Sequence, residues 1–313
     1  MISFGPVPSR RLGKSLGINN IVYPKTCTYS CIYCQAGKTM KKTFRRESFY
    51  DPDDIYDKVS QHLKILKGGN YPDFLTFVSN GEPTLDQNLG KAIRLLKKTG
   101  IPVAVITNAS LLSDKSVRDD LCLADWVSFK LDAGDIITWY LINRPVAGLD
   151  FENMLSGIKQ FSKEFKGTLC TETMIVGGIN DSIENFSAVA EIIRFINPAK
   201  AYLSVPTRPP VEKFVKPADP ERLNEAWQVF SNNQINTEFL TGYEGSETGF
   251  TGNIYEDILN ITAVHPLRED SLLKLLENDN ADFNIVNALI NQHLIKSVIY
   301  EGEKYFIRDY HLR

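Results

Sequence analysis

The stretch FLTFVSNGEPTLDQNLGKAIRLLKKTGIPVAVI, residues 74–106, has two short apolar runs on either side of a segment with helical periodicity. Residues 74–78 and 102–106 have the length and composition of buried strands, and residues 85–98 place their apolar side chains near one face of a helix. A strand, a helix and a second strand in this order predict one parallel βαβ unit.

The same alternation extends in both directions from this unit. Further strands are expected at residues 18–23, 126–131, 168–176 and 201–205, with an additional strand at 237–240. Helices are expected after a cap at Ser113 and at residues 151–165, 182–196 and 220–230. Six βα units within about 240 residues predict an α/β fold, an open partial (β/α)6 TIM-like barrel.

The pattern changes near residues 245–252, which are rich in Gly, Thr and Ser and predict a linker. Three short helical patterns follow at residues 254–264, 268–278 and 283–296, and residues 297–308 predict a hairpin around Glu301-Gly302-Glu303. Three helices and a hairpin are the order of a winged helix. The expected organisation is a barrel domain of residues 1–245 and a small winged-helix domain of residues 252–313.

Composition excludes several classes of protein. With 313 residues and 43% hydrophobic residues, the chain is too apolar for disorder and long enough for a substantial core. It has no apolar run of about 18–20 residues, as a membrane span requires, and no signal-peptide pattern at its start. Five cysteines are few and odd in number, which is unlike a secreted disulfide framework. We therefore expect a cytoplasmic protein.

The net charge of −3 conceals a local asymmetry. Residues 1–46 contain nine bases and no acid. This stretch is either a solvated face or a set of cations, including Arg10 and Arg11, that offsets anionic groups or receives a phosphorylated substrate such as tRNA. From residue 264 onward there are six bases and eight acids, and the helix expected at 283–296 has Lys296 as its one base. Duplex DNA is therefore not expected as a partner.

Cys27, Cys31 and Cys34 form a C-x3-C-x2-C cluster, and Tyr33 precedes the last cysteine. Three thiolates on one loop can hold three corners of a cubane iron–sulfur cluster and leave one iron open to another ligand. The alternatives are a zinc site, which needs four ligands and has no fourth Cys or His nearby in the sequence, and a redox dithiol, which needs only two cysteines.

This cysteine spacing resembles the signature of the radical S-adenosylmethionine (SAM) superfamily. The resemblance implies that a 4Fe–4S cluster held by these cysteines binds SAM at its open iron. It further implies an enzyme in which an electron from the cluster cleaves SAM to methionine and a 5′-deoxyadenosyl radical, which abstracts hydrogen from a substrate. A reductant protein such as flavodoxin or ferredoxin would then supply the electron.

A narrower resemblance rests on residues 8–13 (PSRRLG) and 31–39 (CIYCQAGKT), which are similar to those of the wyosine-synthase-like iron–sulfur oxidoreductases. The wyosine synthases have a second cysteine triad for an auxiliary cluster. Here the other cysteines, Cys122 and Cys170, have no local partner cysteine and are expected in the core. The resemblance therefore does not extend to the reaction of the wyosine synthases.

The superfamily resemblance also implies a SAM site at the ends of the strands. It implies SAM contacts for Tyr33, Gly81, Glu82, Thr107 and Asn108, with Tyr33 against the adenine and residues 177–180 near it. Asn80 replaces the first glycine of the family's Gly-Gly-Glu turn, a mild departure because Asn tolerates positive φ.

Alternation along residues 126–132 gives an independent indication. Ser128, Lys130 and Asp132 share one face of the expected strand. This face lines either a cavity with a polar ligand, in which Lys130 would bind a carboxylate and Asp132 a ribose hydroxyl pair, or a solvated sheet edge. Glu172, Thr173 and Arg208 are candidates for the substrate side. Arg208 is either a clamp for an anionic group or an ordinary surface arginine.

The substrate is not identified by the sequence, and a tRNA base, a small metabolite and a peptide are the candidates. A hypothesis of another class is an iron–sulfur-dependent regulator that binds DNA or a partner through the winged helix. The acidic C-terminal region and the polar barrel strand favour the enzyme.

Overall fold

The structure is a computed structural model that describes residues 2–66, 69–242, 245–246 and 248–309. Its centre is a curled sheet of eight strands, whose order confirms the predicted α/β class. Side by side the strands are β1 (Ser3–Ser9), β2 (Gly13–Ile18), β5 (Phe74–Phe77), β6 (Val103–Thr107), β7 (Trp126–Lys130), β8 (Thr168–Met174), β9 (Lys200–Ser204) and β10 (Thr237–Leu240). β1 is antiparallel to β2, and all the other neighbours are parallel.

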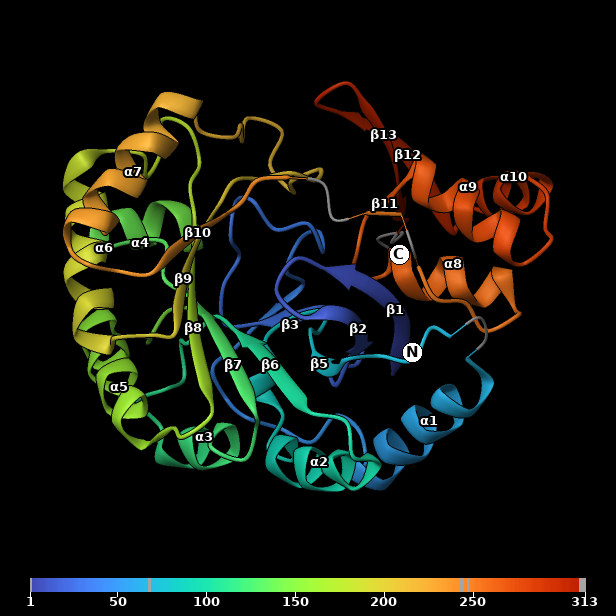
Figure 1. The fold of residues 1–313 in the computed structure, drawn as a ribbon, viewed down its shortest axis with the longest axis horizontal. Coiled ribbons are helices and arrows are strands. Elements are labelled where there is room, and N and C mark those ends of the chain that lie inside the picture. The colour runs from blue at the N-terminus through green and yellow to red at the C-terminus, as the bar shows by residue number, and fades with distance from the viewer. Residues whose placement is uncertain (1, 67–68, 243–244, 247, 310–313) are drawn as a thin grey trace.

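Helices lie along the outer side of the sheet, which curls into an arc in Figure 1. They are α1 (Pro52–Ile65), α2 (Leu89–Leu96), α3 (Lys115–Leu121), α4 (Ile136–Asn143), α5 (Phe151–Glu164), α6 (Ile183–Ile196) and α7 (Pro220–Asn232). Most begin at an Asp or Ser whose side chain accepts a backbone N–H of the first turn, as Asp150 and Ser182 do. α1 and α4 are not among the expected helices, and the cap of α3 is Asp114 instead of Ser113.

The prediction for the first strand is wrong in its position. The strand lies at Gly13–Ile18, and residues 19–23 follow it. Strand propensity does not indicate this strand, because it contains two glycines. Packing requires one of them, since a Cβ on Gly17 would lie 2.1 Å from the ring of Phe4 on β1. β1 was not expected at all, since it contains Pro6 and Pro8.

The C-terminal part has its own helices and sheet. Its elements are α8 (Ile254–Thr262), β11 (Leu267–Arg268), α9 (Glu269–Asn278), α10 (Asn284–Asn291), β12 (Ile295–Tyr300) and β13 (Glu303–Arg308), and its sheet order is β11-β13-β12. The expected helix 283–296 is too long, because His293 has a positive φ and Ile295 begins a strand. The hairpin turn at Glu301 and Gly302 is confirmed. The expected linker, residues 245–252, includes residue 247, which lies outside the described residues.

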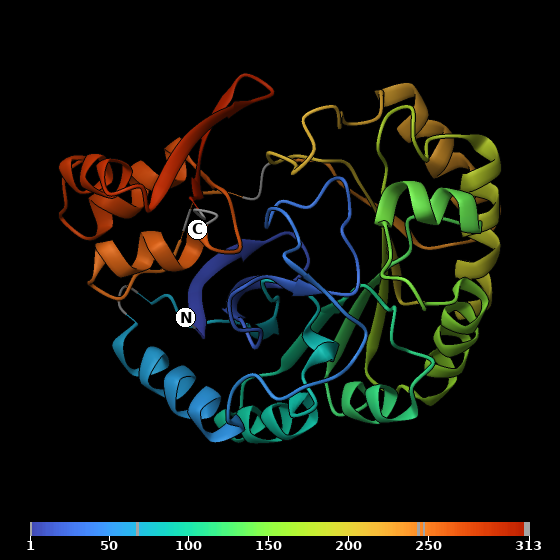
Figure 2. The ribbon, with the colours of Figure 1, turned by 180° about the vertical axis from the view of Figure 1, so that it is seen from behind.

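The C-terminal part and the start of the chain share a core. Phe4 and Val7 of β1 belong to the same buried cluster as Ile258 of α8 and Phe306 of β13. Figures 1 and 2 both show this part next to β1, at the open side of the arc. No helix among the described residues has the length and apolar composition needed to cross a bilayer.

Candidate functional site

A cavity of about 240 Å³ lies at the carboxyl ends of the parallel strands. Cys27, Cys31 and Cys34 all line it. The other expected site residues that line it are Tyr33, Gly81, Glu82, Thr107, Asn108, Lys130 and Arg208. Asp132 is not among the lining residues. Glu172 also lines the cavity, whereas Thr173 and residues 177–180 do not. The structure thus brings together most, but not all, of the expected site residues.

The cysteine loop lies between two short strands, β3 (Thr26–Cys27) and β4 (Lys41–Lys42), which pair in parallel. Hydrogen bonds attach the loop to the end of α4: Ser30 N donates to Asn143 O at 3.0 Å, and Ile32 N donates to Ile142 O at 3.0 Å. Cys27 thus lies in a strand, and the segment around Cys31 is held by a helix that lies more than a hundred residues further along the chain.

Each of the three sulfur atoms receives an N–H donor from a side chain. Asn108 Nδ2 lies 3.6 Å from Cys27 Sγ, Asn143 Nδ2 lies 3.4 Å from Cys31 Sγ, and Lys25 Nζ lies 2.9 Å from Cys34 Sγ. Hydrogen-bond donors around sulfur stabilise a thiolate and, when the thiolate binds iron, adjust the potential of the cluster.

The thiols differ in acidity. Burial raises the pKa of Cys27 to about 12 and also raises that of Cys31. Burial acts in the same direction on Cys34, but the charge and hydrogen bond of Lys25 outweigh it, so the pKa of Cys34 is lowered. Burial tends to lower the pKa of Lys25, while the neighbouring sulfurs of Cys34 and Cys27 raise it overall. Cys34 is therefore the thiol most disposed to ionise.

This donor set fits an iron–sulfur cluster better than a single metal ion. Within the described part of the chain, no three His, Cys, Asp or Glu side chains are arranged to bind one metal ion, as a zinc site requires. A cubane cluster places its three thiolates on three different iron atoms, so its ligands need only surround a common cavity. Cys27, Cys31 and Cys34 do this.

The turn after β5 crosses the cysteine loop closely. Gly81 has φ +144°, and a Cβ at this position would lie 1.8 Å from the carbonyl oxygen of Thr26, so only glycine fits. The explanation expected for Asn80 is wrong, because Asn80 is not among the described residues with positive φ. Instead its backbone N–H donates to Asn19 Oδ1 at 2.9 Å.

The carboxylate of Glu82 joins the ends of β5 and β6. It accepts hydrogen bonds from Thr84 Oγ1 at 2.7 Å, Thr107 Oγ1 at 2.5 Å and Asn108 N at 2.8 Å. Burial raises its pKa, although these hydrogen bonds act in the opposite direction. Glu82 thus fixes Asn108, whose side chain in turn reaches Cys27 and Thr28.

Lys130 lies on an interior strand, since β7 pairs with both β6 and β8, and the solvated-edge alternative is therefore excluded. Its Nζ lies 2.5 Å from Glu172 Oε1, which also accepts from Ser204 Oγ at 2.9 Å. The second carboxylate oxygen of Glu172 forms an ion pair with Arg11. Two bases therefore share one carboxylate in the wall of the cavity.

Asp132 lies outside the cavity, behind the residues that line it. Its carboxylate accepts from Tyr33 Oη at 2.5 Å, Asn143 Nδ2 at 2.8 Å and Met174 N at 2.9 Å. The geometry therefore gives no support to the expected contact with a ribose, and Asp132 instead fixes the ring of Tyr33. Asn180 is also internal, since it donates to Asp132 O and Met174 O.

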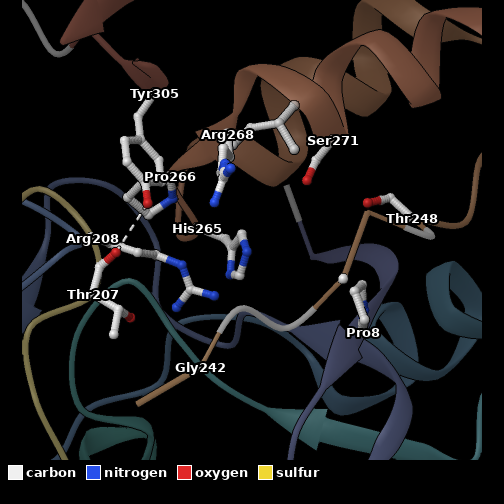
Figure 3. A pocket seen from close by; sticks show the side chains of 12 residues that line it. Pro8, Thr207, Arg208, Gly242, Thr248, His265, Pro266, Arg268, Ser271 and Tyr305 are labelled. Atoms are coloured by element: carbon white, nitrogen blue, oxygen red, sulfur yellow. Dashed lines mark hydrogen bonds between the residues drawn. The ribbon is translucent and has the colours of Figure 1, made fainter. Parts of the chain in front are cut away.

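Arg208 connects this cavity to a smaller one of about 40 Å³, and it lines both. Its Nη1 donates to Gln35 Oε1 at 3.0 Å, next to Cys34 in the chain. In Figure 3, Arg208 and His265 point into the smaller cavity, and the Tyr305 hydroxyl donates to Thr207 O at 3.0 Å. Arg208 is half-buried in these walls.

Sequence reasoning missed Asn143, because no local pattern connects the end of α4 with Cys31. Lys25 was one of nine bases in residues 1–46, and nothing in the sequence distinguished it from the others. Among the other cysteines, Cys170 is buried as expected, but Cys122 is exposed. Neither lines the cavity.

Comparisons with known proteins agree with this geometry. Residues 21–193 match the sequence profile of the Radical SAM superfamily. A UPF0026 protein from Methanocaldococcus jannaschii is 43% identical over 98% of this chain and 96% of its own length. A protein named GTPase Obg from Brachyspira hyodysenteriae is 35% identical over 92% of this chain, which spans 44% of that longer relative.

Solved structures share the fold. SuiB from Streptococcus suis, in complex with the precursor peptide SuiA, superposes with a TM-score of 0.54 at 15% identity. The match covers 72% of this chain and 48% of SuiB. At this identity the likeness concerns the fold alone.

Proposed function

Because the chain belongs to the radical SAM superfamily, we propose that it is an enzyme in which Cys27, Cys31 and Cys34 bind a 4Fe–4S cluster. One observation carries the proposal: three thiols line a single cavity at the strand ends, and each sulfur receives an N–H donor. When bound, the cluster supplies the electron that cleaves SAM into methionine and a 5′-deoxyadenosyl radical for hydrogen abstraction from a substrate.

The surrounding residues have distinct tasks in this proposal. Gly81 lets the turn after β5 approach the cysteine loop, and Glu82 holds Asn108 beside Cys27. Tyr33, oriented by Asp132, offers its ring to the adenine. Lys130 offers a charge to the carboxylate of SAM, and Thr107 lies at the same edge of the cavity. The protein thus binds, orients and excludes water, while the cofactors supply the redox chemistry.

The test is anaerobic reconstitution with iron and sulfide, followed by addition of dithionite and SAM and detection of 5′-deoxyadenosine. We expect cluster absorbance and SAM cleavage in the wild-type chain. Cys31→Ala should lose both, whereas Cys122→Ala, which changes an exposed cysteine outside the cavity, should keep both. A fully loaded wild-type cluster that cleaves no SAM in the presence of any candidate substrate would contradict the proposal.

We propose further that the substrate carries an anionic group, for which Arg208 is the main candidate. Arg208 lines the cavity together with Arg10 and Arg11, so three arginines contribute to its wall. A tRNA, through its phosphates, a phosphorylated metabolite and an acidic peptide all satisfy this requirement. Binding that weakens steeply with salt, and that Arg208→Gln weakens further, would support it.

Other parts of the proposal come from the sequence. We propose a reductant protein such as flavodoxin or ferredoxin as electron donor, a cytoplasmic location, and a division into a barrel domain of residues 1–245 and a winged-helix domain of residues 252–313. The wyosine-synthase-like group is the proposed closer relationship within the superfamily. We propose no binding of duplex DNA, because α10 carries no basic residue. A salt-sensitive complex with duplex DNA would favour the regulatory alternative.

A further inference from the structure

Lys25 is a lysine in an unusual environment. Its side chain is 5% exposed, and its Nζ donates to Cys34 Sγ at 2.9 Å and to Gly37 O at 2.6 Å. A buried ammonium group requires a negative partner. Of the ion pairs found among the described residues, none joins Lys25 to a carboxylate, so the sulfur of Cys34 is the candidate for this partner.

The other two sulfurs have neutral donors. Cys27 and Cys31 receive the side-chain amides of Asn108 and Asn143. A charge-assisted hydrogen bond is roughly twice as strong as a neutral one. Cys34 is therefore the thiol whose side-chain donor carries a charge.

The backbone holds Lys25 in this place. Its carbonyl oxygen accepts from Met40 N at 3.1 Å and from Lys41 N at 3.0 Å, beside the pairing of β3 with β4. Lys38, on the same loop, is exposed and serves as a comparison. The contact between Lys25 and Cys34 is thus fixed at both the backbone and the side chain.

We propose that Lys25 sets the reduction potential of the cluster by acting through Cys34. This inference rests on the proposed function and assigns Lys25 a positioning role. A cluster held here would take up one electron from the reductant protein, and part of the added negative charge would lie on its thiolate ligands. Lys25 keeps its protons, and no bond forms or breaks. A fixed positive charge beside one thiolate stabilises the reduced state of the cluster and so raises its reduction potential.

The first experiment is an anaerobic redox titration of the reconstituted protein without SAM, followed by electron paramagnetic resonance. At a fixed applied potential, Lys25→Met should lower the ratio of reduced to oxidised cluster about tenfold, which corresponds to 59 mV for one electron. Lys25→Gln, which retains a donor but no charge, should show a smaller loss. Lys25→Arg and the exposed control Lys38→Met should match the wild type. A Lys25→Met variant that has wild-type iron content and the wild-type ratio of reduced to oxidised cluster would overturn the proposal.

A second experiment needs no substitution that removes the charge. In wild-type protein labelled with ¹⁵N-lysine, pulsed electron paramagnetic resonance of the reduced cluster should show coupling to one lysine nitrogen. The coupling should disappear in Lys25→Arg, and its absence from the wild type would overturn the proposal. If the wild-type chain binds no cluster, the proposed function fails as well. If the cluster binds and SAM is cleaved, a negative result concerns Lys25 alone.

Discussion

Glu172 is a buried carboxylate held between Arg11 and Lys130. Burial alone would raise its pKa, but the charges of Arg11 and Lys130 and the hydrogen bonds of Lys130 and Ser204 outweigh this and hold the pKa well below its usual range. A carboxyl whose pKa is depressed by folding stabilises the protein above its unfolded pKa of about 4.3, and the stabilisation is lost as pH falls from there toward the folded pKa.

Glu172→Gln should therefore lower the free energy of unfolding at pH 7, because Arg11 and Lys130 lose their anionic partner. The difference from the wild type should shrink as pH decreases below about 4.3. Urea unfolding at several pH values measures this, with Glu225→Gln as control because its pair with Arg222 is exposed. A difference that does not change with pH would contradict the assignment of an ionised Glu172.

Gly81 allows a second prediction at the scale of single residues. Gly81→Ala should destabilise the protein by about 3 kcal/mol or more, since the Cβ would collide with Thr26 O and the φ of +144° is strained for alanine. Gly178→Ala, also at positive φ but with open space around it, should cost about 1–2 kcal/mol. Thermal unfolding compares the two, and equal losses would show that the clash is relieved locally.

Elements differ in how well the sequence predicts them. α5 and α6 are predicted almost to the residue, because an N-cap and a regular apolar face coincide at each. β1 and β2 are not, since prolines and glycines lower their strand propensity while tertiary packing of Phe4 against Gly17 still forms the hairpin. α10 ends earlier than the expected helix because Ile295, which was expected at the end of that helix, begins β12.

The residues of the candidate site likewise differ in how well the sequence predicts them. Cys27, Cys31 and Cys34 are predicted by spacing, and Lys130 by alternation along its strand. The contacts of Asn143 and Arg11 depend on which elements meet across the barrel, and no local pattern encodes that. Asp132 was assigned to the correct face, but the packing of Tyr33 and Asn143 over its carboxylate removes it from the cavity.

The β12–β13 hairpin holds the loop that carries Arg208. Tyr300 Oη donates to Pro206 O at 2.9 Å and Tyr305 Oη donates to Thr207 O at 3.0 Å. We expect the double variant Tyr300→Phe/Tyr305→Phe to lose about 1 kcal/mol for each hydrogen bond and to exchange amide hydrogens faster in residues 205–212.

Hydrogen-exchange mass spectrometry measures the mobility of this loop directly. The matched control is Tyr255→Phe, whose hydroxyl donates to Gln292 at an exposed position and should leave the loop unchanged. Unaltered exchange in the double variant would show that the loop is fixed by the barrel alone.

At the scale of the whole molecule, β1 links the barrel to the C-terminal part. Phe4 is 2% exposed and packs with residues of α8 and β13. Phe4→Ala should cost about 3–5 kcal/mol and make the C-terminal part easier to release by limited proteolysis. Phe214→Ala, at a 55% exposed position, should have little effect on either measurement. Unchanged proteolysis of Phe4→Ala would indicate that other contacts hold the two parts together.

The position of β1 also has a consequence for biosynthesis. A ribosome polymerises Phe4 about 250 residues before Ile254, where its partners in α8 begin. At 5–20 residues per second, translation of the intervening chain takes roughly 12–50 s. During that interval one face of β1 has no native partner, so we expect the nascent chain to bind a chaperone that recognises apolar strands until α8 and the elements after it emerge.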